Sequence, residues 1–551
     1  MSNQSFSNLA KRHFRIYILV LAVISAFTLA YIFLNQISKS FTLSINAHDF
    51  GIQVGAAKNA LYQGNFFCDV INMNYLGDHF SPSLILLAPV LFFSLHPFWV
   101  LLLQNIVMVL SLWQTYRIFR LFFSSRIFAV LPLIILVPNL YFNEIFKHDF
   151  HIEAFGFYLF LLLIYEQYRP VFRPIYFFPV LVLLLGVKED VSLVLTAFFG
   201  IQFLRFRRKR DLLISLSCLL YFGLTMKVLM PYFSDGIYTH MHRYQSLGNS
   251  PSEVFKNLFS DPMRFLAVLK WDSIHSFMKS FYYFPVLAFP EFLPALVPMY
   301  YNNASDYFVQ SNFWWIHSYL ILPLVILSTA SAFRILGALL NGRYWDINLK
   351  SGTFTGKVGL ISRLSSLKEL IVIKSEFRSL WFFTFFHFIF RNYQLVFIWL
   401  VFLSFTVFSL FGRFQTVFKD SYVIPVLISD WKKNQPIVDA IETRIRKKIP
   451  LDSRIASCGE LQPHLLGYSY SGFLGLPQWD SLTFVNTDYL IFLEDRTPWP
   501  FGNDSSYAAY KQARLDAFAP FYKDELFLVL KKKDVQARPL TSRAPGRLPV
   551  F

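Results

Sequence analysis

Long apolar runs separated by short charged turns constrain the fold of this chain more than any other feature. A helix needs about 20 apolar residues to cross a bilayer, and runs near that length recur over the first 412 of the 551 residues. Hydrophobic residues make up 55% of the chain and charged residues only 15%, too few to give a soluble protein of this size a normal surface. The sequence therefore predicts a polytopic α-helical membrane domain over residues 1–412.

The charged turns predict how this domain is oriented. A net charge of +17 could indicate binding to nucleic acid, but Lys and Arg lie in short clusters between the apolar runs, as expected for cytoplasmic turns. We therefore expect no nucleic-acid partner, a cytoplasmic N-terminus and about nine spans. The predicted spans are residues 14–35, 98–119, 127–144, 152–167, 174–187, 191–204, 212–231, 317–338 and 392–411.

Two apolar segments do not fit a straight span. Residues 83–95 are too short to cross, which predicts a juxtamembrane or re-entrant helix. Residues 281–301 contain four prolines at close spacing, and each proline removes a backbone donor and clashes with the preceding turn. Non-helical backbone at membrane depth persists only where protein or a water-filled cavity surrounds it. We predict that residues 281–301 form a broken, re-entrant element that lines a cavity.

The composition changes near residue 420 to that of a soluble protein. Residues 436–450 carry apolar side chains at helical spacing, and three short apolar runs are typical of strands. The predicted strands are residues 454–458, 488–493 and 525–533. The sequence thus predicts a small extracytoplasmic α/β domain over residues 420–534 that covers the membrane domain. The basic, proline-rich tail at residues 535–551 is expected to be disordered.

The three cysteines place few constraints on the fold. Cys68, Cys218 and Cys458 are too few for a disulfide framework and lack the spacing of metal ligands. The sequence leaves undecided whether Cys68 and Cys458 form a single disulfide bridge.

The loop at residues 41–82 contains two acid–imidazole pairs, His48–Asp49 and Asp78–His79, each next to the membrane. Desolvation and the membrane field can tune Asp49 as a base. Asp49 could instead be an ordinary N-cap of the helical run that follows it. Asp78 and His79 could likewise form a cap or a turn. Our hypothesis is that this loop carries the chemistry and that the spans position it.

A second group of ionisable residues follows the third predicted span. His148 and His151 flank Asp149, and Glu153 lies two residues further on. Two imidazoles around a carboxylate favour metal ligation or a hydrogen-bonded relay. An ordinary cluster at the membrane interface is the alternative. The candidate metal ligands are Asp49, His148, Asp149 and His151.

A third group, Lys188–Glu189–Asp190, lies where an apolar helix meets water, and alone it could be a local salt bridge. The predicted topology places all the acid-bearing turns of the first seven spans on the outer face. Several acid clusters on one membrane face favour a shared site over separate structural roles.

Four more residues could hold an anionic partner such as a lipid phosphate. Lys227 lies near the outer end of its span, with Arg243 in the next loop, although Lys227 could also extend its charge to the membrane surface. His317 and Tyr319 begin the following span and could bind the same ligand. The alternative for Tyr319 is a tyrosine of the aromatic belt.

Six motifs in this order resemble the prokaryotic membrane family called domain of unknown function 2079. The resemblance covers residues 45–335, and many members have FDFH in the third motif, so that His148 is a departure. The motifs are HDFGIQ at 48–53, GDHFSP at 77–82, HDFHIE at 148–153, VKEDV at 187–191, YQSLGNSP at 244–251 and HSY at 317–319.

That family is similar to glycosyltransferases of the GT-C architecture, which have many spans and use polyprenyl-phosphate sugars. The resemblance implies an acid at the catalytic centre in the first outer loop, which is Asp49 here, with Asp149 as a second acid. It also implies the inner membrane of a prokaryote as the location.

The residues and the resemblance together predict a GT-C-like glycosyltransferase at the extracytoplasmic face. Asp49 is expected to be the general base, and Lys188, Lys227 or Arg243 to stabilise the departing lipid phosphate. A set of acids and imidazoles is expected to orient the substrates or to hold an optional divalent cation. These residues are His48, Asp78, His79, Asp149, His151, Glu189, Asp190, His317 and Tyr319. A transporter or flippase for an anionic lipid or sugar, and a non-catalytic envelope scaffold, are the alternative functions.

Overall fold

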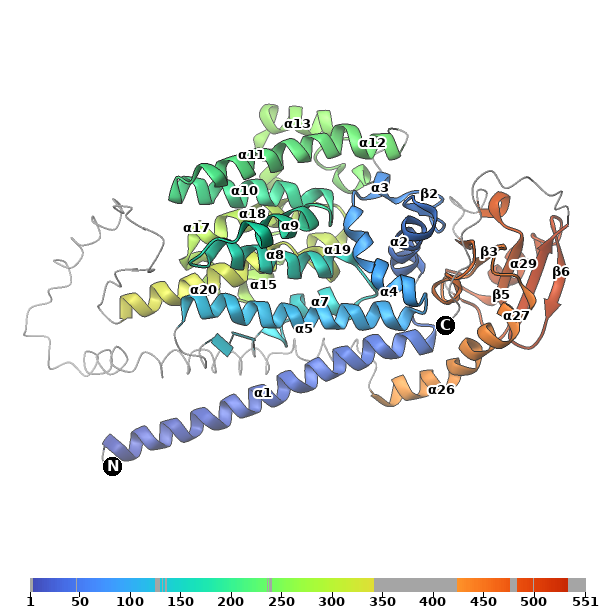
Figure 1. Ribbon diagram of the computed structural model, residues 1–551, viewed down its shortest axis with the longest axis horizontal. Coiled ribbons are helices and arrows are strands. Elements are labelled where there is room, and N and C mark those ends of the chain that lie inside the picture. The colour runs from blue at the N-terminus through green and yellow to red at the C-terminus, as the bar shows by residue number, and fades with distance from the viewer. Residues whose placement is uncertain are drawn as a thin grey trace, which may run out of the picture.

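The computed structural model has a helical bundle, a small layer at one end of it and a sheet domain beyond that layer (Figure 1). It describes residues 3–45, 47–123, 129–130, 132–133, 136–234, 236, 240–340, 424–475, 483–498 and 500–533. The predicted span at 392–411 and the tail at 535–551 lie outside these residues, as does part of the predicted span at 127–144.

Helices of the bundle pack through buried aromatic side chains, among them Phe146, Phe157, Phe160 and Phe198, all fully buried. The bundle helices are α1 (Asn3–Thr42), α5 (Pro97–Phe122), α7 (Leu140–Lys147), α8 (Ile152–Tyr168), α9 (Pro174–Leu185), α10 (Glu189–Phe206), α11 (Lys209–Leu224) and α20 (Ile321–Leu340).

The length and apolarity of the described helices support fewer spans than the nine predicted. Within the described residues, Pro97–Phe122 and Lys209–Phe233 are long and apolar enough to cross a membrane. A third candidate is a pair of helices, Phe308–Ser318 and Ile321–Ile335, bent by 68°. The predicted span at 174–187 contains only the 12-residue helix α9. The described helices therefore agree with a helical membrane protein, but they do not by themselves give nine spans.

The proline-rich segment is divided into short helices, and three of its four prolines lie where a new one starts. They are α16 (Phe284–Leu287), α17 (Phe289–Phe292), η5 (Leu293–Ala295) and α18 (Leu296–Asn303). Pro285, Pro290 and Pro294 occupy the first turn of α16, α17 and η5, where the missing N–H breaks no hydrogen bond. The segment packs against α20 and α10.

The connection from α11 to that segment consists of short helices. They are η3 (Thr225–Leu229), α12 (Met230–Phe233), η4 (Met241–Tyr244), α13 (Pro251–Ser260), α14 (Pro262–Ala267) and α15 (Trp271–Lys279). The later connection contains α19 (Phe308–Ser311) and η6 (Trp315–Ser318).

Residues 41–82 and the short apolar helices after them form the layer between the bundle and the sheet domain (Figure 1). The elements are η1 (Ala47–Gly51), α2 (Ile52–Gln63), β1 (Phe67–Cys68), β2 (Met73–Asn74), α3 (Tyr75–Asp78), η2 (Pro82–Leu87) and α4 (Ala88–Phe93). β1 and β2 pair antiparallel. Together η2 and α4 are too short to cross a membrane, in agreement with the expectation for residues 83–95.

The C-terminal domain has the predicted α/β character. Its sheet has the order β4-β3-β5-β7-β6, with β3 parallel to β4 and β5 and the other pairs antiparallel. The predicted strands correspond to β3 (Arg454–Ser457), β5 (Tyr489–Leu493) and β7 (Phe527–Lys532). The remaining elements are α26 (Ile424–Ala440), η8 (Ile441–Ile445), α27 (Arg446–Lys448), η9 (Gln462–Leu465), β4 (Tyr470–Phe473), α29 (Asp504–Gln512) and β6 (Phe518–Lys523).

A buried ion pair attaches the layer to this domain. Lys58 and Asp69 lie 3.3 Å apart, and each is 3% exposed. Lys58 Nζ also donates to Tyr468 O, and the Ser471 N–H donates to Asp69 Oδ2 at 3.0 Å. Cys68, Cys218 and Cys458 are buried free thiols, so that no bridge joins Cys68 to Cys458.

Candidate functional site

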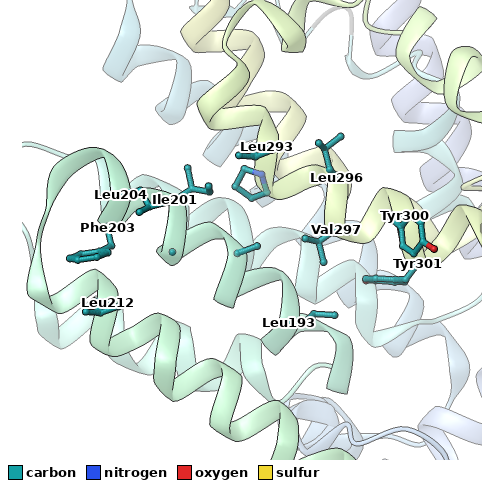
Figure 2. A pocket seen from close by; sticks show the side chains of 13 residues that line it. Leu193, Ile201, Phe203, Leu204, Leu212, Leu293, Leu296, Val297, Tyr300 and Tyr301 are labelled. Atoms are coloured by element: carbon teal, nitrogen blue, oxygen red, sulfur yellow. The ribbon is translucent and has the colours of Figure 1, made fainter. Parts of the chain in front are cut away.

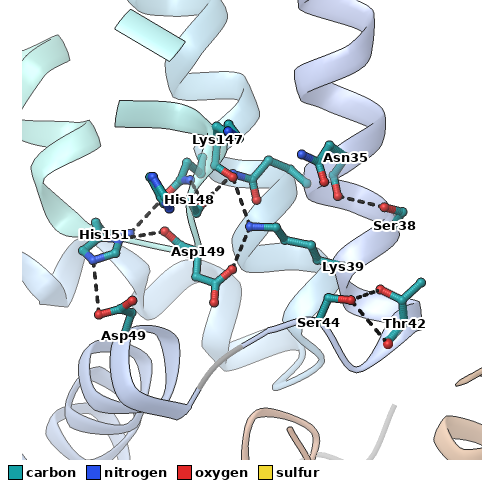
Figure 3. Close-up of polar contacts among 12 residues, drawn as sticks. Asn35, Ser38, Lys39, Thr42, Ser44, Asp49, Lys147, His148, Asp149 and His151 are labelled. Carbon is teal, nitrogen blue, oxygen red and sulfur yellow. Dashed lines mark hydrogen bonds and ion pairs between the residues drawn. The ribbon is translucent and has the colours of Figure 1, made fainter. Parts of the chain in front are cut away.

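The centre of the candidate site is a pair formed by Asp49 and His151. Asp49 comes from η1 and His151 from the turn before α8, and Asp49 Oδ1 lies 3.7 Å from His151 Nε2 (Figure 3). The His151 side chain is 7% exposed, whereas the Asp49 side chain is 39% exposed and can meet a substrate. His48 Nδ1 is also 3.7 Å from Asp49 Oδ1.

Asp49 does not cap the helix that follows it, and its role as a base stays a prediction. The N-cap of α2 is Gly51, and no side chain caps this helix. Burial opposes the charged form of Asp49, but hydrogen bonds and charge from His151 and His48 hold its pKa well below its usual range. Burial likewise opposes the imidazolium of His151, but Asp49 raises the pKa of His151 to about 9. Asp49 is therefore a paired anion and not a helix cap.

Backbone and side-chain contacts fix the orientation of His151. Its Nδ1–H donates to Asp149 O at 2.8 Å, which leaves Nε2 facing Asp49. The His151 N–H donates to Gln104 Oε1 at 3.1 Å, and the Ile152 N–H donates to Gln53 Oε1 at 2.8 Å. α5 and α2 thus hold the turn between α7 and α8 from two sides.

Asp149 has a positioning contact of its own. Its Oδ1 lies 2.9 Å from Lys39 Nζ at the end of α1 (Figure 3). Lys39 Nζ also donates to Lys147 O at 3.0 Å. Asp149 therefore ties α1 to the turn, and it supports His151 through its carbonyl.

His148 points to a different partner. Its Nε2 lies 2.8 Å from Glu144 Oε2, one turn earlier on α7, and the Trp315 N–H donates to the same oxygen at 3.4 Å. Of the predicted metal ligands, His148 pairs with Glu144 and Asp149 with Lys39, while His151 faces Asp49. Within the described residues, these four do not meet as one ligand set.

Lys188, Glu189 and Asp190 are not a local salt bridge. Lys188 Nζ lies 3.0 Å from Glu153 Oε1 on α8. Glu189 Oε1 lies 3.1 Å from His79 Nδ1, and Glu189 Oε2 accepts a hydrogen bond from the Phe80 N–H. Three consecutive side chains thus reach three different elements.

The third of them, Asp190, accepts two hydrogen bonds from tyrosines. Tyr319 OH donates to Asp190 Oδ1 at 2.9 Å, and Tyr301 OH donates to Asp190 Oδ2 at 2.7 Å. Tyr319 therefore points into the protein and is not part of a membrane-interface belt.

Glu153 connects these contacts to the Asp49–His151 pair. It is 2% exposed, and its Oε2 has no hydrogen-bond partner among the described residues. It lies two residues after His151, and its Oε1 is 3.0 Å from Lys188 Nζ. We call the connected residues the acid–histidine cluster: Asp49, His79, His151, Glu153, Lys188, Glu189, Asp190 and Tyr319.

The remaining predicted residues lie beside the cluster or away from it. His317 lies beside the broken segment, where its backbone carbonyl accepts a hydrogen bond from Asn302 Nδ2 at 3.1 Å. Arg243 Nη1 lies 3.5 Å from Gln310 Oε1, and its guanidinium lies over Tyr307. Lys227 is exposed on η3, and no contact of the described residues joins it to the cluster.

An apolar groove with a volume of about 770 Å³ lies along α10 (Figure 2). Residues of α10, α11 and the broken segment line it. Tyr301 is one lining residue, and its hydroxyl group donates to Asp190. The groove therefore reaches the tyrosine that binds Asp190, and a re-entrant segment at residues 281–301 stays a prediction.

Several members of the site were not predicted. Lys39, Gln53 and Gln104 position the turn before α8, and Tyr301 joins the groove to Asp190. Gln53 ends the motif HDFGIQ, whereas the sequence context of Lys39, Gln104 and Tyr301 contains no motif that marks them. His240 lies 3.1 Å from Asp78, and the pattern His-Met-His at 240–242 was a signal that could have identified it.

The fold and the site define a helical membrane protein whose ionisable residues gather at one end of the bundle. A model of the family described as "Predicted membrane protein (DUF2079)" matches residues 39–347, more than half of the chain. The chain belongs to this family, which confirms the resemblance drawn from the six motifs.

Comparison with solved structures finds crystal structures of ArnT from Cupriavidus metallidurans. The form bound to undecaprenyl phosphate is 12% identical with a TM-score of 0.43, and the apo form is 10% identical with a TM-score of 0.44. Each alignment covers 93% of this chain and 97% of the other. No curated protein matches the sequence.

Proposed function

We propose that this protein is a GT-C-like glycosyltransferase that transfers a sugar from a polyprenyl-phosphate donor to an extracytoplasmic acceptor. The supporting observation is that the acid–histidine cluster lies next to an apolar groove. A substrate with a charged head and a long hydrocarbon tail matches both parts, because charged groups bind to charged partners and tails bind to apolar surface. The proposed location is the inner membrane, with the cluster and the C-terminal domain outside.

In this proposal Asp49 accepts the proton of the acceptor hydroxyl. The acceptor oxygen forms a bond to the anomeric carbon, and the bond from that carbon to the phosphate oxygen breaks with its electron pair leaving on the phosphate. The low pKa of Asp49 makes it a weak base. Proton transfer therefore follows as the new bond forms and the hydroxyl becomes acidic.

The other residues have supporting roles. Arg243 and Lys188 are the proposed partners of the departing phosphate, since Lys227 is exposed and stands apart from the cluster. His151 orients Asp49, and Asp149 positions His151. His48, Asp78, His79, Glu189, Asp190, His317 and Tyr319 shape the space for the acceptor.

Sugar transfer by purified protein in liposomes tests this proposal, with a panel of radiolabelled polyprenyl-phosphate sugars as donors. Asp49→Asn is expected to lower the rate by about 10²–10⁴-fold, because it removes the proton acceptor and keeps the shape. Asp272→Asn, at an exposed acid on α15, is the matched control and should retain full rate. Transfer by Asp49→Asn at the wild-type rate would remove the proposed base.

The transporter alternative makes a different prediction in the same liposomes. A transporter or flippase places ionisable groups near the middle of the membrane, whereas this cluster lies where helices end. Movement of labelled lipid across the bilayer without a new glycosidic bond would favour transport. The absence of both sugar transfer and lipid movement would favour a scaffold.

A further inference from the structure

A second set of side chains meets where α3 ends, outside the Asp49–His151 pair. Asp78 and His79 come from this end of α3, and His240 comes from just before η4. One ligand atom from each of the three lies within 4.8 Å of the others. In the described part of the chain, this is the group of three whose donor atoms come this close.

The ligand atoms lie close to the spacing expected around a tetrahedral cation. His240 Nε2 lies 3.1 Å from Asp78 Oδ1, and the rings of His79 and His240 stack with centroids 4.4 Å apart. Zinc bonds of about 2.0–2.2 Å at tetrahedral angles place neighbouring ligand atoms about 3.3–3.5 Å apart. The ligand atoms lie within 4.8 Å of one another, and the stacked rings of His79 and His240 must rotate out of their parallel arrangement for a nitrogen of each to face one ion with Asp78.

Two further observations favour a metal ligand role for the histidines. Neither ring nitrogen of His240 meets hydrogen-bond geometry in the described part of the structure, although both are shielded from solvent. His79 Nδ1 lies 3.1 Å from Glu189 Oε1, which leaves Nε2 for a metal. A carboxylate on the second ring nitrogen is the usual support of a metal-bound histidine, because it fixes the ring and increases its basicity.

We infer that Asp78, His79 and His240 form a site for a divalent transition metal, best suited to Zn²⁺. Two imidazoles and one carboxylate select such a metal over Mg²⁺ or Ca²⁺, which prefer oxygen ligands. Three protein ligands leave a fourth position for water or a phosphate oxygen. The ion would also join the loop at 41–82 to the connection after α12, next to Glu189 of the cluster.

Metal content of the full-length protein tests the site without any sugar donor. After chelator treatment and re-addition of Zn²⁺, elemental analysis should find one zinc per wild-type chain, and zinc should raise the unfolding temperature. His240→Ala should lose the zinc and the shift in temperature. His242→Ala, at the exposed histidine two residues later, is the matched control and should keep both.

A second variant covers the case in which His240→Ala fails to fold. His240→Asp keeps a ligand atom and should retain zinc with weaker affinity. Replacement by Co²⁺ should give the absorption of a tetrahedral site in wild type. Wild-type protein without zinc, or His240→Ala with one tightly bound zinc, would overturn the inference. Asp49→Asn should bind zinc normally, so that failure of sugar transfer and failure of metal binding remain distinguishable.

Discussion

At the scale of single residues, the site depends on which side chains pair with one another. The pattern His-Asp at 48–49 is compatible with a cap or with a functional pair, and local sequence cannot choose between them. The choice comes from His151, about one hundred positions away, whose Nε2 faces Asp49. Lys188, Glu189 and Asp190 show the same point, because each has a partner on another element.

The Asp49–His151 pair predicts how stability depends on pH. The folded-state pKa of His151 is raised from 6.5 to about 9, so its stabilising contribution is complete below pH 6.5 and is lost as pH rises through 9. The pKa of Asp49 is lowered, so its contribution is present above its ordinary value of 3.8 and is lost only in stronger acid. The unfolding temperature of the wild-type protein should therefore fall as the pH rises from 6.5 to 9.

The measurement is thermal unfolding in detergent across that range. The unfolding temperature of His151→Gln should fall less over this pH range than that of wild type, because glutamine cannot carry the positive charge of the imidazolium. His242→Gln, at an exposed histidine, should follow the wild-type curve. An equal slope for wild type and His151→Gln would contradict the assignment of the charged pair.

At the scale of elements, close packing places α8 against the end of the cluster. A Cβ atom added at Gly156 would lie 2.9 Å from Tyr319 and 2.9 Å from Val187, which is closer than side chains tolerate. The glycine therefore lets α8 approach both the turn at Val187 and the tyrosine that binds Asp190.

Gly156→Ala should destabilise the protein by about 1–3 kcal/mol through overpacking. Gly223→Ala is a helical control with nothing within 4 Å of the added Cβ, and it should be neutral or slightly stabilising. Chemical denaturation of the two variants measures the difference. Equal stability of Gly156→Ala and wild type would mean that α8 shifts at no cost.

The apolar groove makes a prediction at the same scale. Ala197→Trp places a large side chain in the groove, and it should raise KM for a long-chain donor more than for a short-chain analogue. Leu220→Trp, on an exposed part of α11 outside the groove, should change neither value. The test is steady-state transfer with donors of two chain lengths. A uniform loss of kcat for both donors would argue against a tail in the groove.

At the scale of the whole molecule, the C-terminal domain holds the loop at residues 41–82 in place. Asp69 contacts Lys58, Asn59 and the backbone of Ser471. The Ala47 N–H donates to Gly459 O only two residues before Asp49. The domain is therefore coupled to the position of Asp49, beyond the covering role expected from sequence.

Asp69→Ala should cost about 3–5 kcal/mol, because it leaves Lys58 buried without its partner charge. We expect a lower unfolding temperature and faster proteolysis in residues 41–82. Asp452→Ala, at an exposed acid of the same domain, should match wild type. Wild-type protease resistance of Asp69→Ala would show that the ion pair does not hold the layer to the domain.

Sequence alone determined the properties that local chemistry controls. Apolar runs required helices in a membrane, the prolines of residues 281–301 required a broken segment, and β-strand patterns identified three of five strands in the C-terminal sheet. The six motifs also established the family. Such features depend on neighbours along the chain, so their signals are present in short windows of sequence.

Only the tertiary structure decided the partners of the charged groups. Lys39, Gln104 and Tyr301 carry no local signal of their contacts with Asp149, His151 and Asp190. Short helices such as α9 also end where packing and turns end them, and the count of about nine spans stays a prediction. The physical reason is that a buried charge must find an opposite charge or hydrogen-bond donor nearby in space, and sequence order does not specify which distant residue supplies it.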